Sequence, residues 1–133
     1  MIRYLLDTNA FSYVVRESHA RFSRRFESVR LDEIAISVIT EAELRFGLAR
    51  RPQAHALAHS VNSLLHRITL VPWTSDAAKH YAEIRAELER QGQRMEDLDV
   101  MIAAHALAEN AVLVTHDSAF WRVPRLKIED WTA

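Results

Sequence analysis

The chain has 133 residues, 49% of them hydrophobic and 26% charged, which is typical of a globular protein with a substantial core, and a single domain over residues 1–133 is expected. It contains no cysteine, which excludes a disulfide framework and a thiolate zinc site, and its two glycines are too few for a P-loop or a dinucleotide-binding fingerprint. The formal net charge of -1 excludes a strong global field for nucleic acid, and no membrane span or signal peptide is evident, so the cytoplasm is the expected location.

The N-terminal segment 4–6 is apolar and ends abruptly in three polar residues, Asp7, Thr8 and Asn9. A short buried strand here would place Asp7 at the carboxyl end of the strand, where ligands bind in open α/β sheets. Two interpretations of this residue remain open. Asp7 caps the following helix, or it ligates a hard divalent cation, which prefers oxygen ligands.

Two helices are expected next, over residues 10–16 and 19–29, with Ser18 as the N-cap of the second. The second helix has phenylalanines on one face and arginines on the other. Those arginines could contact phosphate, although a solvated face is the commoner meaning of such a pattern.

A second strand is expected over residues 34–37, followed by a helix over 38–50 that carries two glutamates. Glu41 has Arg45 four residues on, which is the arrangement that favours a surface ion pair. Glu43 lies instead on the apolar side of the helix, where an unpaired carboxylate is costly. Glu43 is therefore a second carboxylate that needs a partner.

A further helix is expected over residues 53–67, then a strand over 68–71 and a long helix over 75–91. His55 and His59 have the i, i+4 spacing of a zinc-binding pair. The glutamate that follows the first histidine in the catalytic version is absent, so we interpret the pair as part of a polar surface stripe.

After the stop signal at Gly92, residues 95–108 form a helical pattern that is apolar nearly all round, which predicts a buried helix. Asp97 is expected to be its N-cap. Asp99 would then lie within the first turn, where the helix dipole offsets only about 1 kcal/mol of the cost of a buried charge. A cation would satisfy Asp99 better, whereas His105 is interpreted as a hydrogen-bonded core histidine.

A fourth strand, over residues 111–114, ends in Thr115 and Asp117 and so repeats the arrangement at the N-terminus. A last edge strand is expected over residues 125–131. This alternation of strands and helices predicts an α/β fold with a mainly parallel, twisted sheet of four to five short strands and helices on both faces.

Five motifs, in this order and spread over essentially the whole chain, resemble those of the PIN-domain ribonucleases, and specifically of VapC toxins of type II toxin–antitoxin (VapBC) modules. Each motif is weak alone, and the set is specific. They are Leu6-Asp7-Thr8-Asn9, then Thr40-Glu41-Ala42-Glu43-Leu44, then Asp99 with Ile102-Ala103-Ala104-His105-Ala106, then Val114-Thr115-His116-Asp117 with Phe120, and finally Glu129-Asp130-Trp131.

The resemblance implies an acidic active site that binds Mg²⁺ or Mn²⁺. It makes Asp7 and Asp99 the principal metal ligands, with Glu43 and Asp117 completing the shell directly or through water. The position of Asp117 varies in such toxins and is often Asn. The implied site residues are Asp7, Glu43, Asp99 and Asp117 as the catalytic acids, with Asn9 and Thr115 in support.

The resemblance also implies a reaction and partners. The reaction is in-line hydrolysis of RNA, typically tRNA or rRNA cut at one site, which leaves 5′-phosphate and 3′-hydroxyl ends and inhibits translation. The partners are a cognate VapB-type antitoxin, a second copy in a homodimer, and operator DNA reached through the antitoxin in a hetero-oligomer. We expect the antitoxin segment in an apolar groove of the N-terminal helices, around Phe11, Val14 and Phe22.

Three alternatives to a toxin are weighed. A PIN-type housekeeping nuclease would have no antitoxin. The small size of the present chain and its lack of further domains argue weakly against this alternative. An inactive PIN-like binding module of RNA or protein usually loses one of the acids, all of which are retained here. A phosphatase with an aspartyl nucleophile would carry a second aspartate two residues after the first, where this chain has Asn9.

Overall fold

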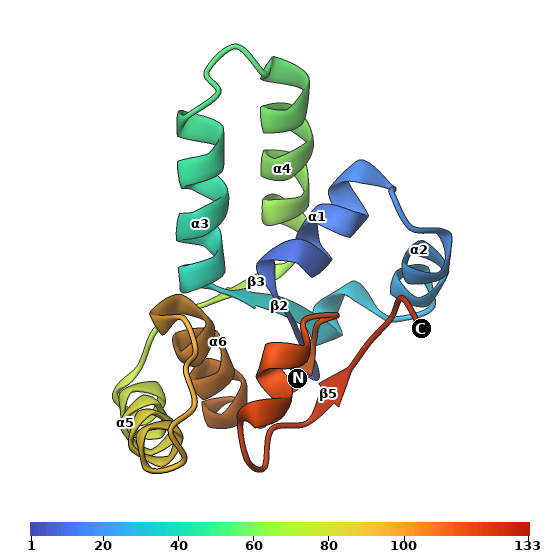
Figure 1. The fold of residues 1–133 in the computed structure, drawn as a ribbon. Coiled ribbons are helices and arrows are strands. Elements are labelled where there is room, and N and C mark those ends of the chain that lie inside the picture. Colours follow the sequence, from blue (N-terminus) through green and yellow to red (C-terminus); the bar gives the residue numbers. More distant parts are fainter.

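A fully parallel five-stranded β-sheet runs through the molecule in the order β3-β2-β1-β4-β5 (Figure 1). The computed structural model describes residues 1–133. Because all four strand pairings are parallel, the mainly parallel sheet that the alternating pattern predicted is confirmed. The strands are β1 (Tyr4–Leu6), β2 (Ile34–Ser37), β3 (Thr69–Val71), β4 (Val112–Val114) and β5 (Ile128–Glu129).

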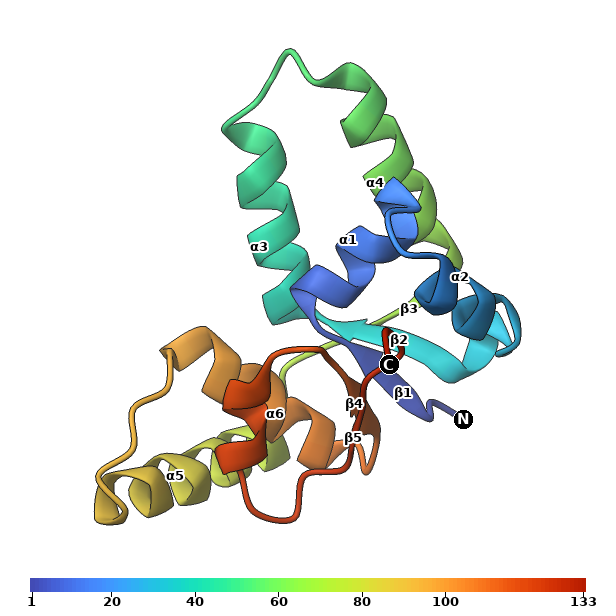
Figure 2. The same cartoon turned by 45° about the vertical axis from the view of Figure 1, so that its right-hand side comes forward.

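Helices cover both faces of the sheet (Figure 2). The first four helices pack on one face, and the last two, with the 3₁₀ helix η2, pack on the other. No helix is long and apolar enough to cross a membrane. The helices are α1 (Thr8–Arg16), α2 (Ala20–Glu27), α3 (Val38–Ala49), α4 (His55–Arg67), α5 (Ser75–Arg90) and α6 (Asp97–Ala108), with short 3₁₀ helices η1 (Leu31–Glu33) and η2 (Ser118–Arg122).

The core lies in two layers because successive strand residues point to opposite faces. Leu6 of β1 faces helices α1 to α4, together with Phe11 and Phe22. Leu5, one residue earlier, faces α5 and α6, together with Leu113 of β4. Because both faces are covered, β1 is apolar throughout, as expected for a central parallel strand.

Two predicted helix starts are wrong by one residue. The N-cap of α2 is His19, not Ser18, because His19 is the extended residue and its Nδ1 accepts the amide of Phe22 at 3.3 Å. Helix α6 has Glu96 as its extended N-cap, so Asp97 is the first helical residue rather than the cap.

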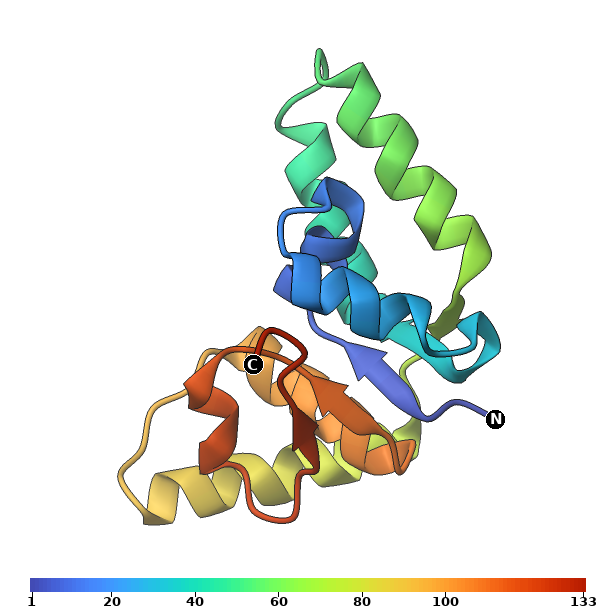
Figure 3. The ribbon, with the colours of Figure 1, turned by 90° about the vertical axis from the view of Figure 1, so that its right-hand side faces the viewer.

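The last strand is shorter than predicted. Only Ile128–Glu129 pair with β4. At the start of the predicted strand, Arg125 adopts a left-handed backbone conformation with φ of 68°, which an extended strand does not have. The segment after β5 folds back on α2, where the Arg25 guanidinium lies 5.1 Å from the ring centroid of Trp131. The C-terminus therefore lies close to the N-terminal helices (Figure 3).

Candidate active site

Asp7 lies at the carboxyl end of β1 and is 5% exposed. One carboxylate oxygen accepts the amide of Ala10 at 2.8 Å, and the other accepts the hydroxyl of Thr115, so the capping interpretation is confirmed. Each oxygen keeps a second lone pair, so capping does not exclude a cation. Burial raises the pKa of Asp7, the two hydrogen bonds oppose that rise, and the charges of Asp117 and Glu43 add to it.

Asp99 lies in the first turn of α6 and is half-buried. Burial, followed by the charges of Asp117, Glu43, Asp7 and Glu96 in that order, raises the pKa of Asp99 from its ordinary 3.8 to about 6. The predicted acids therefore lie near enough to repel one another, although they come from four separate elements of the fold. Clusters of carboxylates that repel one another are typical of cation-binding sites and of many catalytic sites.

The side chains do not form a ready-made cage. No three Asp, Glu or His side chains are grouped closely enough to enclose a metal ion. The fit to a hard divalent cation therefore depends on the chemistry of the donors, which are all carboxylate oxygens, and on the repulsion between them.

Glu43 projects from α3 and accepts the hydroxyl of Thr8 at 2.7 Å. This contact was not predicted, although a hydroxyl one residue after Asp7 is an available signal. Asn9, which the resemblance implied instead, is exposed and makes no side-chain hydrogen bond, so its role stays a prediction. Glu41 points away from the site and pairs with Arg45 at 2.8 Å, as predicted.

Thr115 connects two of the acids. It is buried at the carboxyl end of β4, donates its hydroxyl to Asp7, and accepts the backbone amide of Asp117 at 3.0 Å. Asp117 is exposed and accepts the amide of Ala119 at 2.9 Å, which begins η2. Because β1 and β4 are hydrogen-bonded neighbours, the polar residues that follow them meet at one edge of the sheet.

The other polar candidates lie outside the cluster. Asp97 pairs with Arg85 at 2.6 Å. His105 is fully buried, with Nδ1 at 2.7 Å from the Ser37 hydroxyl and Nε2 at 3.1 Å from the carbonyl of Pro72. Nε2 must donate to that carbonyl, so Nδ1 accepts from Ser37, and burial lowers the pKa of His105. The interpretation of His105 as a core histidine is confirmed.

A histidine beside the acids was missed. Nδ1 of His116 lies 2.8 Å from Asp130, and this hydrogen bond raises the pKa of His116. Burial opposes ionisation of Asp130, but hydrogen bonds from Thr132 and His116 outweigh it and lower the pKa of Asp130. The motif Glu129-Asp130-Trp131 was the available signal, but it had been given no role.

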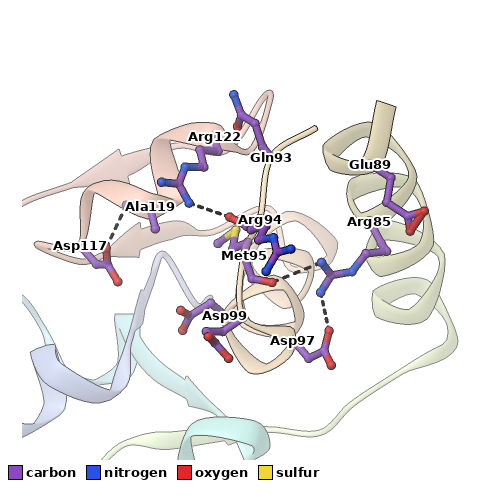
Figure 4. A pocket seen from close by; sticks show the side chains of 11 residues that line it. Arg85, Glu89, Gln93, Arg94, Met95, Asp97, Asp99, Asp117, Ala119 and Arg122 are labelled. Carbon is purple, nitrogen blue, oxygen red and sulfur yellow. Dashed lines mark hydrogen bonds and ion pairs between the residues drawn. The ribbon is translucent and has the colours of Figure 1, made fainter. Parts of the chain in front are cut away.

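Two hollows border the acids. A cavity of about 620 Å³ is bounded at one end by Asp99 and Asp117 (Figure 4). A smaller groove of about 220 Å³, with a mixed apolar and polar lining, lies between α1, α3 and α4 and includes Glu43. The groove predicted around Phe11, Val14 and Phe22 is thus displaced, because Phe22 is buried in the core and only Phe11 lines the hollow.

The chain is similar to known proteins over nearly its whole length. Residues 4–126 match the family model "PIN domain". Ribonuclease VapC2 of Rickettsia felis is 33% identical over 96% of this chain and 97% of its own, and the tRNA(fMet)-specific endonuclease VapC of Shigella flexneri is 32% identical over 99% and 100%.

Solved structures agree with the sequence comparison. The chain from the crystal structure of DNA-bound VapBC from Salmonella typhimurium superposes with a TM-score of 0.91 at 32% identity, covering 98% of this chain and 99% of that one. The chain from VapBC2 of Rickettsia felis, bound to a fragment of its promoter, gives 0.86 at 33% identity, covering 97% and 98%. With these similarities across its full length, the chain belongs to the PIN-domain family and, within it, to the VapC ribonucleases of VapBC toxin–antitoxin systems.

Proposed function

We propose that this protein is a metal-dependent endoribonuclease toxin that cleaves RNA at a specific site, inhibits translation and is neutralised by a cognate antitoxin. The observation that carries this proposal is the electrostatic one. Burial of Asp99, together with the charges of carboxylates from the ends of β1 and β4 and from helix α3, raises the pKa of Asp99 to about 6.

The donors suit Mg²⁺ or Mn²⁺, with Asp7 and Asp99 as principal ligands and Glu43 and Asp117 binding directly or through water. When bound, such a cation supplies an activated water and neutralises charge on the phosphate. The protein's own contribution is orientation. Thr115 and the Ala10 amide hold the Asp7 carboxylate, and Thr8 holds that of Glu43.

Single-stranded or looped RNA is the proposed substrate form, since its bases are accessible. The Shigella flexneri relative is named a tRNA(fMet)-specific endonuclease, which makes tRNA the first substrate to test and rRNA the second. The cluster is local, in a chain with a net charge of -1, so the RNA has to be held by groups near the site rather than by a global field.

The proposal is tested by cleavage of tRNA with Mg²⁺, with Mn²⁺ and with EDTA. Asp7→Asn and Asp99→Asn should each abolish cleavage and leave the fold intact, because each removes one negative charge from a repelling cluster. Glu41→Gln is the matched control, because Glu41 is on the same helix as Glu43 but pairs with Arg45, and it should cleave like the parent. Full activity in EDTA would exclude the metal mechanism.

A toxin is distinguished from a housekeeping nuclease by expression in a bacterial host. The parent protein alone should arrest growth, Asp99→Asn should not, and co-expression of the small gene beside its own should restore growth. Growth that continues normally under the active parent would favour the housekeeping alternative.

We further propose a VapB-type antitoxin whose C-terminal segment lies in the groove between α1, α3 and α4. Its lining is mixed. Val15, Leu44 and Leu48 supply apolar contacts, whereas Glu43 and the arginines Arg16, Arg50 and Arg51 are charged. The relatives from Rickettsia felis and Salmonella typhimurium were solved as VapBC with DNA, which supports a toxin–antitoxin complex that contacts operator DNA. Homodimerisation within that complex is part of the same proposal.

The proposed inhibition places a cation of the antitoxin at the acids beside this groove, and arginine suits paired carboxylates because its planar fork donates two hydrogen bonds. We therefore expect an Arg or Lys of the antitoxin near Asp7 and Asp99. Changing the basic residues of its C-terminal segment to Ala should weaken both binding and inhibition. A variant that inhibits as tightly as the parent would mean that the block is purely steric.

A further inference from the structure

The cavity beside Asp99 and Asp117 has a basic wall as well as an acidic end (Figure 4). It lies between α5, the start of α6 and η2. The acidic end consists of two members of the proposed catalytic cluster. Three arginines also line the cavity: Arg85, Arg94 and Arg122. The lining includes three further carboxylates, Glu89, Glu96 and Asp97, of which Asp97 pairs with Arg85.

The wall is an anchored loop rather than a free one. Arg122 donates to the carbonyl of Arg94 at 2.7 Å from the η2 side. Arg85 donates to the carbonyl of Met95 at 3.3 Å from the α5 side, and pairs with Asp97 at 2.6 Å. The loop between α5 and α6 is therefore held from both sides by hydrogen bonds. These bonds fix the position of the Arg94 backbone and of the Arg122 guanidinium.

The three arginines differ in whether a carboxylate of the chain pairs with them. Arg85 is already paired with Asp97. Arg94 and Arg122 are exposed and form no ion pair with any carboxylate of the chain. Unpaired arginines are common on surfaces, but these two line the same cavity as Asp99 and Asp117. An RNA phosphate that leaves the acidic end enters the space they border.

We propose that this cavity binds the RNA backbone on one side of the scissile phosphate, with Arg94 and Arg122 as its phosphate contacts. The proposal rests on the ribonuclease function proposed above and names the surface that holds the substrate. Guanidinium groups suit phosphate because they donate two parallel hydrogen bonds. Arg85 is a positioning residue that holds the loop. The acids alone would repel RNA, and this cationic pair offsets that repulsion where the strand leaves the site.

The test measures RNA binding apart from cleavage. The full chain carries Asp7→Asn to stop cleavage, and it is titrated with Mg²⁺ present into a fluorescent, mixed-sequence, single-stranded RNA of about twelve nucleotides. Adding Arg94→Gln and Arg122→Gln should weaken binding about tenfold at low salt, and should reduce the slope of log K against log[NaCl] by about 1.4, since each single-strand phosphate contact contributes about 0.7.

Two controls separate electrostatics from structure. Lysine at both positions keeps the charge, and should restore the salt slope even if the loop shifts. Arg67→Gln removes an arginine that is also exposed and unpaired but lies at the end of α4, two residues before β3 and at the opposite end of the parallel sheet, and it should leave binding unchanged. Circular dichroism of each variant checks the fold.

The proposal is overturned if the double glutamine variant keeps the parent affinity and slope, if Arg67→Gln weakens binding equally, or if the parent chain does not bind the RNA. Cleavage is measured separately on a denaturing gel. The parent and the arginine variants, each with Asp7 restored, are compared there with the Asp7→Asn chain. Cleavage that depends on Asp7 without any effect of the arginines would retain the proposed function and refute this binding surface.

Discussion

Replacing Asp99 by Asn should stabilise the protein in the absence of divalent cations while it abolishes activity. The pKa of Asp99 rises from 3.8 to about 6, and this rise of about two pKa units corresponds to about 3 kcal/mol of unfolding free energy. Asp99 is only half-buried, so solvent screening reduces the expected gain to about 1 to 1.5 kcal/mol. For a chain of this size, that raises the melting temperature by about 4 °C.

The pH dependence has a definite sign. A carboxyl group whose pKa is raised by folding favours the folded state when protonated, so the parent gains stability below the unfolded pKa of 3.8 and loses it as pH rises through about 6. The advantage of Asp99→Asn should therefore be full at about pH 7.5 and only about a third as large at about pH 4.5.

The assay is thermal unfolding in EDTA and again in Mg²⁺, at both pH values. Mg²⁺ should raise the melting temperature of the parent, because a ligand that binds only the folded state stabilises it, and should raise that of Asp99→Asn much less. Asp97→Asn is the matched control on the same turn of α6, since Asp97 pairs with Arg85 instead. An Asp99→Asn protein that is less stable than the parent in EDTA at neutral pH would refute the proposed repulsion.

Two further changes test the residues behind the site. Thr115→Val removes the hydroxyl that donates to Asp7 and accepts the amide of Asp117, so the Mn²⁺ affinity measured by calorimetry should fall about 10- to 100-fold. An unchanged affinity would mean that Thr115 does not orient the ligand. His105→Leu leaves the Ser37 hydroxyl and the Pro72 carbonyl without their partner, so urea unfolding should show a loss of about 2 to 3 kcal/mol with normal cleavage by the folded protein; equal stability would show that the network is dispensable.

The sequence predicted most of the architecture because its signals were local and repeated. Apolar segments that end in polar residues placed Asp7 and Asp117 after the carboxyl ends of two strands, and the structure shows that these strands are neighbours. Glu43 and Asp99 were found because each is a carboxylate on an otherwise apolar helical face. These signals depend on secondary-structure periodicity, which a single sequence records directly.

What the sequence could not predict depends on backbone conformation and on distant contacts. The choice of His19 over Ser18 as a cap is decided by which residue is extended. The shortened β5 is preceded by Arg125 in a left-handed conformation, an unusual state for a residue with a β-carbon. The pair His116 and Asp130 joins residues 14 positions apart through the fold of the C-terminal segment.

Anomalous diffraction from crystals soaked in Mn²⁺ tests most directly whether the carboxylates form one cation site. A peak should lie about 2.0 to 2.6 Å from oxygens of both Asp7 and Asp99, with Glu43 and Asp117 bound to it or to its waters, and the peak should vanish in Asp7→Asn. A well-occupied peak that contacts neither Asp7 nor Asp99 would contradict the proposed active site.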